Sequence, residues 1–467
     1  TQGMSGVRVS DSDASVGATA YAGATGENEG NNVNWDFTSD VASWIGGESG
    51  DFTDGANWSG GTAPKAGTVV SIIAGDGESI AVTIPVGTNA AFASLLMMAG
   101  DDGSAMLTAK GTIDVSGTVT MGDGGTLALD AYDDDGEAPN RIGGDLTVQS
   151  GGMVTHTGPA ALENAKLHLA VTGNVVVDEG GSIDVTGKGY SANNGPGGSG
   201  WFESPAYGGR GNCSKACYGS VFCPTNWGSG AIGVGSSGGG AVHLVVAGTL
   251  KVDGTVNADG SGDGTYSGTG GSVWIECAAI SGSGTVSAIE GMGVSPYAGA
   301  GGRIAVYQRT ATDFTAFPRG RFPTGSYGTS AAGTIYLESA SKAKNGADLI
   351  IDRGTLNSSL VTDFPMPGDG DAMTALRSIN LIVGKHATVK LLRDEADVPQ
   401  QIKIRSLLLE AATSKLVLNA NELIVIDPSV RRDKDWDPSA TVDATDLYKQ
   451  VAGSMRWLFV GGVLFVR

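Results

Sequence analysis

The densest group of residues that could bind a metal ion is acidic. Asp133, Asp134, Asp135 and Glu137 fall within five consecutive positions, and carboxylate oxygens are the ligands that calcium prefers. Their spacing does not match the twelve-residue loop of an EF-hand. The cluster therefore predicts a calcium site on charge and oxygen density alone, and a solvated turn is the competing interpretation. We expect no other cofactor.

The cysteines are the next candidates for chemistry. There are four, and three share one Gly-rich segment: Cys213, Cys217, Cys223 and Cys277. A disulfide there would limit the entropy of a long loop, whereas the spacing lacks the Cys-x2-Cys pairs and the nearby histidine of zinc modules. We therefore predict disulfides rather than zinc, with Cys277 as the fourth partner or an unpaired thiol. Disulfides indicate an oxidising compartment, so we expect an extracellular or cell-surface location.

Catalytic β-helices need clustered carboxylates, or a basic residue that accepts a proton, on one face of a sheet. The nearest approach to such a set is a ladder of polar residues that recurs in short strands: Asp114, Asp184, Asn257 and Ser287. A carbohydrate groove and an ordinary solvent-facing surface both fit that ladder. We expect no enzyme, and a polysaccharide lyase or hydrolase is the alternative.

The elements that would position these residues repeat along the chain. The segment Leu167–Gly173 aligns with Val242–Gly248, which places His168 and His243 at equivalent positions. A four-residue strand then recurs, with a hydroxyl, an apolar, a polar and an apolar residue: Thr112–Val115, Ser182–Val185, Thr255–Ala258 and Thr285–Ala288. Strands this short cannot bury an apolar face alone, but stacked coils can. Equivalent residues should therefore stack, with the histidines on one coil face and a metal pair there as the less favoured interpretation.

Composition agrees with an all-β solenoid. Gly contributes 76 of 467 residues and Pro only 15, with no Gly-X-Y period, which argues against collagen. Hydrophobic residues make up 40% and charged residues 17%, enough to bury a long core. The net charge of −20 repels nucleic acid, so we expect no nucleic-acid partner. No apolar run approaches the length of a transmembrane helix. The absence of a starting Met and a signal peptide predicts a processed or excised chain.

The middle of the chain resembles a known group of proteins. It contains the motifs GGGAVHL, GTLKVDGTVNADG, GGSVWI, GSGTVSA, GGRIAVY and GTIYL. These resemble Gly-rich, secreted, right-handed parallel β-helix surface proteins of the adhesin and autotransporter-passenger type, over roughly residues 187 to 352. A segment with Trp44, Trp58 and Pro64 is similar to the entry segment of such proteins, in which aromatic residues cover the first coil. The resemblance implies a surface solenoid and assigns no catalytic residue.

These observations predict three regions, with a two-sheet sandwich as the rival fold. Residues 1–40 form an extended arm or tail. Residues 41–430 form a right-handed parallel β-helix, with a loop insertion at 187–240. That insertion holds seven aromatic residues, which either pack on one another or form a recognition surface. Residues 431–467 form a cap or an assembly strand.

The last segment is apolar and nearly uncharged. It turns as a hairpin at Gly461-Gly462 or runs as one long strand, and it covers the last coil or pairs with another molecule. Its candidate assembly residues are Trp457, Leu458, Phe459, Val460, Val463, Leu464, Phe465 and Val466. We therefore expect a non-enzymatic structural or adhesive surface protein that associates with itself into filaments through terminal strands, or that contacts cell surfaces or carbohydrate.

Overall fold

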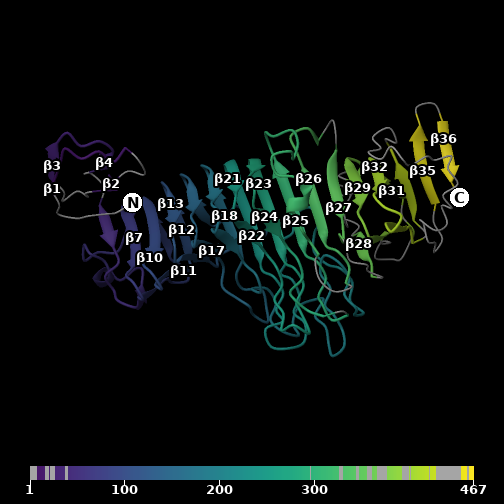
Figure 1. Ribbon diagram of the computed structural model, residues 1–467, viewed down its shortest axis with the longest axis horizontal. Coiled ribbons are helices and arrows are strands. Elements are labelled where there is room, and N and C mark those ends of the chain that lie inside the picture. Colours follow the sequence, from purple (N-terminus) through teal and green to yellow (C-terminus); the bar gives the residue numbers. More distant parts are fainter. Residues whose placement is uncertain are drawn as a thin grey trace.

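The chain forms a β-solenoid of about 12 turns with almost no helix, as the repeats predict (Figure 1). The computed structural model describes residues 8–15, 20–21, 27–36, 40–294, 296–325, 330–342, 346–354, 360–364, 376–391, 399, 401–419, 421–426, 454–459 and 462–466. Short 3-10 turns occur at Gly55–Asn57 and Arg319–Arg321. The stacked parallel strands rule out the sandwich.

Each coil of the first section contributes strands to three faces. The first face holds β5 (Val41–Ser43), β7 (Val69–Ala74), β10 (Ser94–Ala99), β13 (Val119–Met121), β16 (Leu146–Val148) and β19 (Val175–Val177). The second face holds β6 (Ser49–Asp51), β8 (Ser79–Ile84), β11 (Ser104–Ala109), β14 (Gly125–Leu129), β17 (Met153–Thr155), β20 (Ser182–Asp184), β22 (Thr255–Asn257) and β24 (Thr285–Ser287).

The third face is the longest. It holds β9 (Asn89–Phe92), β12 (Thr112–Val115), β15 (Asn140–Ile142), β18 (Leu167–Val171), β25 (Arg303–Gln308), β26 (Thr334–Glu338), β27 (Ala347–Ile351), β29 (Ile379–Val383) and β32 (Ser406–Leu409). The long strands β21 (Ala241–Val252) and β23 (Ser272–Ser281) run from the third face onto the first face of the following coil, where they continue its stack.

The predicted register of the repeats is confirmed where the two long segments align. His168 pairs with His243, and Leu169 pairs with Leu244, in parallel strands. Residues that point inward from successive coils stack into one dry core, and Leu169, Leu244 and Ile275 are fully buried. Burial of such a side chain contributes roughly 1.5–3 kcal/mol, which a single short strand could not supply.

One of the four small strands is placed differently from the prediction. Ser182, Thr255 and Thr285 stack in β20, β22 and β24 of the second face as expected. Thr112–Val115, however, is β12 on the third face, between β9 and β15. Asp114 is therefore not part of the ladder of Asp184, Asn257 and Ser287. Four residues of alternating polarity fit every face equally well, so the pattern alone cannot assign one.

The chain reverses direction once within the third face. β26 pairs with β27 in antiparallel fashion, after which parallel stacking resumes with β29 and β32. The later coils enclose a second core, with faces formed by β28 (Thr362–Phe364), β30 (Thr388–Leu391) and β33 (Lys415–Val417), and by β31 (Gln401–Ile404) and β34 (Glu422–Val425).

Strands at this reversal are buried on both sides. Ile350 of β27 packs into the first core, whereas its neighbours Leu349 and Ile351 pack into the second. The third face is thus a wall shared by two stacks of coils. The sequence predicted one parallel β-helix over 41–430, with a loop insertion at 187–240, and it did not predict the reversal, because a run such as Leu349-Ile350-Ile351 does not reveal on which side the chain continues.

The termini carry additional short strands. Near the N-terminus β1 (Arg8–Ser10) pairs with β3 (Glu27–Gly30), and β2 (Ala20–Tyr21) pairs with β4 (Trp35–Asp36), both in parallel. The segment predicted as an arm or tail thus contains parallel pairs. At the other end β35 (Ser454–Phe459) extends the sheet of β34, and β36 (Gly462–Val466) pairs with β35 as an antiparallel hairpin.

Candidate functional site

The longest loops leave the solenoid at one corner and form a lobe beside the middle coils (Figure 1). They join β20 to β21, β22 to β23 and β24 to β25, and we call residues 185–240, 258–271 and 288–302 the loop lobe. Their backbones bond across neighbouring segments. Gly189 N–H donates to the Gly238 carbonyl over 2.8 Å, and Gly239 N–H donates to the Thr269 carbonyl over 2.9 Å. The loop lobe is therefore held by its backbone as well as by its side chains.

Glycine is required where these segments touch. A Cβ atom on Gly238 would lie 1.9 Å from the Gly228 carbonyl oxygen, and one on Gly301 would lie 1.6 Å from that of Thr324. No side chain fits at such distances, because the obstacle is backbone rather than a movable side-chain end. The high glycine content is thus a packing requirement of the loop lobe.

A few buried side chains fix the loop lobe to the solenoid. Trp227 is fully buried, and its indole N–H donates to the Ala165 carbonyl over 2.9 Å. The Arg303 guanidinium, also fully buried, donates twice to the Tyr218 carbonyl, at 2.9 and 2.8 Å. Burying this cation is costly unless its donors are satisfied. Both contacts hold residues 218–227 against the outer side of the third face.

Two aromatic residues of the loop lobe face solvent instead. Trp201 is 71% exposed and Phe202 is 68% exposed. Phe202 has a φ of 62°, a left-handed conformation that costs a bulky residue energy. Its ring lies 6.2 Å from that of Tyr297, which in turn lies 5.1 Å from that of Tyr266. We call Trp201, Phe202, Tyr266 and Tyr297 the aromatic tip.

The seven aromatic residues of the insertion therefore divide between the two predicted roles. Tyr207 and Trp227 are fully buried, and Tyr190, Tyr218 and Phe222 are half-buried. Trp201 and Phe202 are exposed, as are three other apolar residues of the loop lobe: Val234, Met292 and Val294. Self-packing and an exposed surface thus occur in the same loop.

Ionisable residues gather where the loop lobe joins the second face. Lys188 Nζ donates to Thr155 Oγ1 over 2.5 Å, and burial lowers the pKa of its ammonium group. Asp259 accepts from Ser287 Oγ over 2.6 Å and from Ile289 N–H over 2.8 Å, and burial raises its pKa to about 6. The charge of Asp184, at the end of β20, adds to the raised pKa of Asp259 and opposes the lowering of the Lys188 pKa. Such a group could exchange protons near neutral pH.

The predicted stacking of the two histidines is confirmed. The rings of His168 and His243 lie 4.2 Å apart, and the stack continues to Trp274 at 3.7 Å. Burial lowers the pKa of His168 to about 4. His243 Nε2 lies 3.4 Å from Glu276, whose other oxygen bonds to Arg309. The two rings stack face to face as a ladder, and Glu276 is bonded to Arg309. This geometry does not support a metal site between the histidines.

The structure separates the residues predicted to bind calcium. Lys166 Nζ lies 2.6 Å from Asp134 Oδ2, whereas Arg141 lies 2.5 Å from Glu137. Asp133 Oδ1 accepts from the backbone N–H of Asp135 over 3.0 Å, as in an ordinary turn. Within the described ranges, no group of three or more His, Cys, Asp or Glu could hold a metal ion. The turn interpretation therefore accounts for the cluster better than the calcium site.

All four cysteines are free thiols in the structure. Cys277 is fully buried in the core through β23, and burial raises its pKa to about 12. Cys217 is shifted in the same way, whereas Cys223 is exposed. Since burial protects a thiol from ionisation, Cys277 is a poor disulfide partner. The disulfides stay a prediction, centred on Cys213, Cys217 and Cys223.

The C-terminal assembly residues fall on the terminal hairpin. Phe459 pairs with Gly462, and Trp457 pairs with Leu464, so the hairpin alternative fits and a single long strand does not. Leu458, Val463, Phe465 and Val466 lie in the same two strands, and Val460 lies outside the described residues. Whether this hairpin pairs with another molecule stays a prediction.

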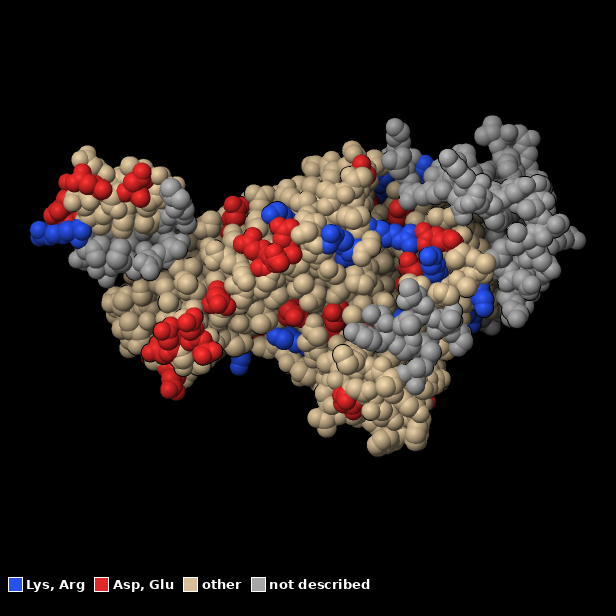
Figure 2. Space-filling view, in the orientation of Figure 1, with Lys and Arg blue, Asp and Glu red and all other residues tan. Residues whose placement is uncertain are grey.

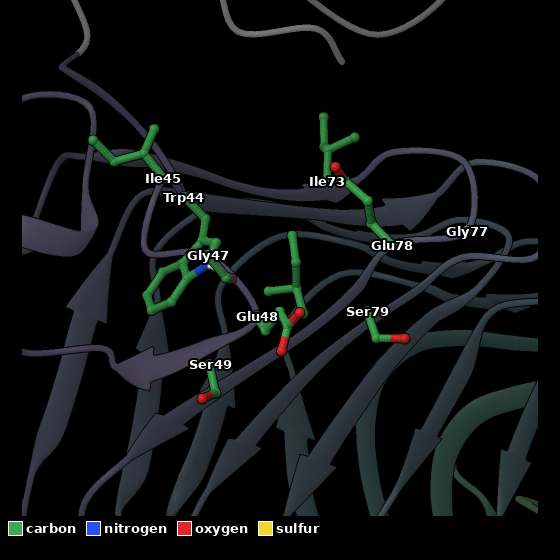
Figure 3. A pocket seen from close by; sticks show the side chains of 10 residues that line it. Trp44, Ile45, Gly47, Glu48, Ser49, Ile73, Gly77, Glu78 and Ser79 are labelled. Atoms are coloured by element: carbon green, nitrogen blue, oxygen red, sulfur yellow. Dashed lines mark hydrogen bonds between the residues drawn. The ribbon is translucent and has the colours of Figure 1, made fainter.

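A groove of about 810 Å³ lies on the first coils (Figure 3). Ile45 and Ile73 flank it, with Glu48 between them in this view, and both isoleucines are exposed. Its other lining residues are Trp44, Gly47, Ser49, Gly77, Glu78, Ser79 and Ile80. Beneath it Trp44, Phe52 and Trp58 pack edge to face and close the first coil. The aromatic entry segment implied by the resemblance is therefore buried under the groove.

Comparison with protein-family models, with curated proteins and with solved structures found no match to this chain. In the part of the chain that the structure describes, no helix is both long and apolar enough to cross a membrane.

Sequence reasoning missed several of these residues. Lys188 and Asp259 belong to no repeated strand, and the number of residues in each corner loop decides where they meet. Arg303 lies in the motif GGRIAVY, in which the glycines are the more obvious feature, so the arginine was not singled out. The groove, in contrast, left a readable signal, because Glu48 and Glu78 precede strands near the N-terminus in a region with few cations.

Proposed function

We propose that this chain is a non-enzymatic extracellular or cell-surface protein with a structural or adhesive role. In this proposal the stacked coils are a rigid support, and the loop lobe carries the surface that touches a partner. The observation that carries it is the aromatic tip, in which Trp201 and Phe202 are exposed on a backbone that is cross-bonded to its neighbours.

Energetics favour a binding role for the aromatic tip. Exposing two large rings forgoes the stabilisation that burial would give them, and the left-handed backbone at Phe202 adds roughly 1–2 kcal/mol of strain. A strained, exposed aromatic residue has no benefit for the isolated fold. Aromatic residues are enriched at protein contact surfaces because they offer a large area with few rotatable bonds.

The charge distribution supports the same role. Most of the visible face of the loop lobe consists of uncharged residues, with few acidic atoms (Figure 2). A partner would therefore be recognised by stacking and hydrogen bonding rather than by opposite charge. An uncharged carbohydrate or a polar protein surface fits this chemistry.

The test measures adhesion directly. Beads coated with the full chain would be applied to intact cells of the source organism, and the fraction retained under flow would be compared with that of the Trp201→Ser/Phe202→Gly variant. We expect a loss of about tenfold, as for removal of a hot spot worth about 1.4 kcal/mol. Val234→Ser, which removes an exposed apolar residue of the loop lobe outside the aromatic tip, is the matched control. Equal retention of all three proteins would reject the adhesive role.

One observation favours a second candidate function, a carbohydrate-active enzyme. Asp259, with its raised pKa, lies near Asp184 and Lys188 at the base of the loop lobe. A carboxyl group with a raised pKa and a second carboxyl group nearby are what acid–base cleavage of a glycosidic bond requires. New reducing ends released from a polysaccharide by the wild type, but not by Asp259→Asn, would favour this candidate over the first.

A further inference from the structure

The distribution of charge along the solenoid is uneven. Residues 40–150 carry 16 Asp and Glu against 3 Lys and Arg, whereas residues 376–426 carry 5 against 7. The net charge therefore changes from −13 at the first coils to +2 at the last coils. These coils lie at opposite ends of the long axis (Figure 1).

At the first coils the excess acid lines one corner. The turns that join the first face to the second carry Asp76 and Glu78, then Asp101 and Asp102, then Asp123, in successive coils. Asp76 accepts from the backbone N–H of Asp101 over 3.1 Å, which fixes the stacking of two of these turns. Among the described residues, no Lys, Arg or His lies within ion-pair distance of these five carboxylates.

The groove opens onto this corner and adds an apolar component. Glu48 and Glu78 belong to its lining, and the exposed side chains of Ile45 and Ile73 flank it. Its outer boundary is the first coil, where β5 pairs with β7 and β6 pairs with β8, and where residues 57–59 bond to the outer edge of the coil. The groove thus offers two things to a partner: negative charge and apolar contact.

The last coils present the complementary surface. Arg377, Lys385 and Lys415 are exposed there, and none of them forms an ion pair within the part of the chain that is described. The two ends therefore carry net charges of opposite sign. Because the complementary surfaces differ and lie at opposite ends, contact between copies would be heterologous and would not close, which is the geometry of a filament.

We propose that the groove on the first coils receives the basic last coils of a second copy of this chain, so that copies associate head to tail. This inference rests on the proposed structural role and gives it a specific interface. Opposite charge aligns the ends, and the apolar flank of the groove holds them.

The experiment measures the association of the full chain by sedimentation velocity. Association should be about tenfold weaker in about 1 M than in about 0.1 M NaCl, because the screening length falls from about 10 Å to about 3 Å. Glu48→Lys/Glu78→Lys should remain monomeric at concentrations where the wild type associates. Mixing it with Lys385→Glu/Lys415→Glu should restore association, because the reversed charges again match. Glu179→Lys, an exposed acid in a corner turn of a middle coil, should associate as the wild type does.

Folding of each variant would be confirmed by its far-UV circular dichroism, and Glu48→Gln/Glu78→Gln, which removes charge without reversing it, should show an intermediate loss. Unchanged association of the charge-reversed variants, or association that salt does not weaken, would overturn the proposal. So would saturable binding of oligolysine to a wild type that stays monomeric, since the groove would then serve another cationic partner. A monomeric chain whose beads still adhere through the aromatic tip would refute this interface and leave the adhesive role standing.

Discussion

The coils and the loop lobe solve the same stacking problem by different means. In the coils, inward side chains such as Leu244 and Ile275 fill a dry core, and neighbouring strands bond to one another along the sheets. In the loop lobe, glycine lets neighbouring backbones approach and bond to one another directly. Glycine therefore has two separate roles in this chain: it allows turns between strands, and it replaces side-chain packing where segments run without a sheet.

A methyl group added in the loop lobe should disturb the packing of that region severely. Gly301→Ala would place Cβ against the Thr324 carbonyl oxygen, which cannot move without displacing its own segment. We expect a loss of about 4 kcal/mol or more in the free energy of unfolding, beyond ordinary overpacking. Urea denaturation would measure it. Gly60→Ala, where the nearest heavy atom outside the local chain is 3.9 Å away, is the control and should change stability by less than about 0.5 kcal/mol. Equal effects would show that close backbone approach is not what holds the loop lobe.

The junction between the two regions should be sensitive to pH. His156 is buried, its Nδ1 lies 2.6 Å from the Thr157 carbonyl, and its Nε2 accepts from Ala241 N–H over 3.2 Å. Burial lowers its pKa to about 4, against about 6.5 when unfolded. Between these values the unfolded chain binds more protons, so stability should fall as pH drops from about 6.5 to about 4, by at most about 3 kcal/mol.

Urea midpoints at pH 7 and pH 4.5 would test this dependence. His156→Gln, which cannot titrate, should be less stable at pH 7 but should show a flatter profile. His168 contributes in the same direction, because its pKa is lowered as well. Asp259 opposes both, because its raised pKa lets the folded state hold a proton up to about pH 6. If the pH dependence of stability is the same in His156→Gln as in the wild type, other titratable groups cause it.

The smallest expected effect lies at the aromatic tip. Phe202→Gly relieves the left-handed strain at a position where glycine has no steric penalty, so we expect stability to rise by about 0.5 kcal/mol or to stay unchanged. Phe202→Ala keeps the strain, so its stability should be slightly lower than that of the glycine variant. Thermal unfolding of the two would separate strain from exposure. A marked loss of stability in both would mean that the ring contributes to folding, against the binding role.

How much of this molecule the sequence could predict differs between the same two regions. The coils were predictable because Leu167–Gly173 and Val242–Gly248 share one pattern, and their register is confirmed residue by residue. Alternation alone could not choose a face for Thr112–Val115, and it could not reveal the reversal at β27. In the loop lobe, contacts such as that of Arg303 with Tyr218, 85 positions apart, depend on three loops meeting, which no local pattern encodes.

The wall shared by the two stacks has a mechanical and evolutionary consequence. Tension applied to the ends would strip coils from either stack one at a time until it reaches β26 and β27, where removing one strand uncovers both cores at once. That point should resist extension most strongly. We expect that coils can be added or removed on either side of the shared wall. The wall itself cannot be removed without exposing two cores to water, so changes in the length of the chain should leave it in place.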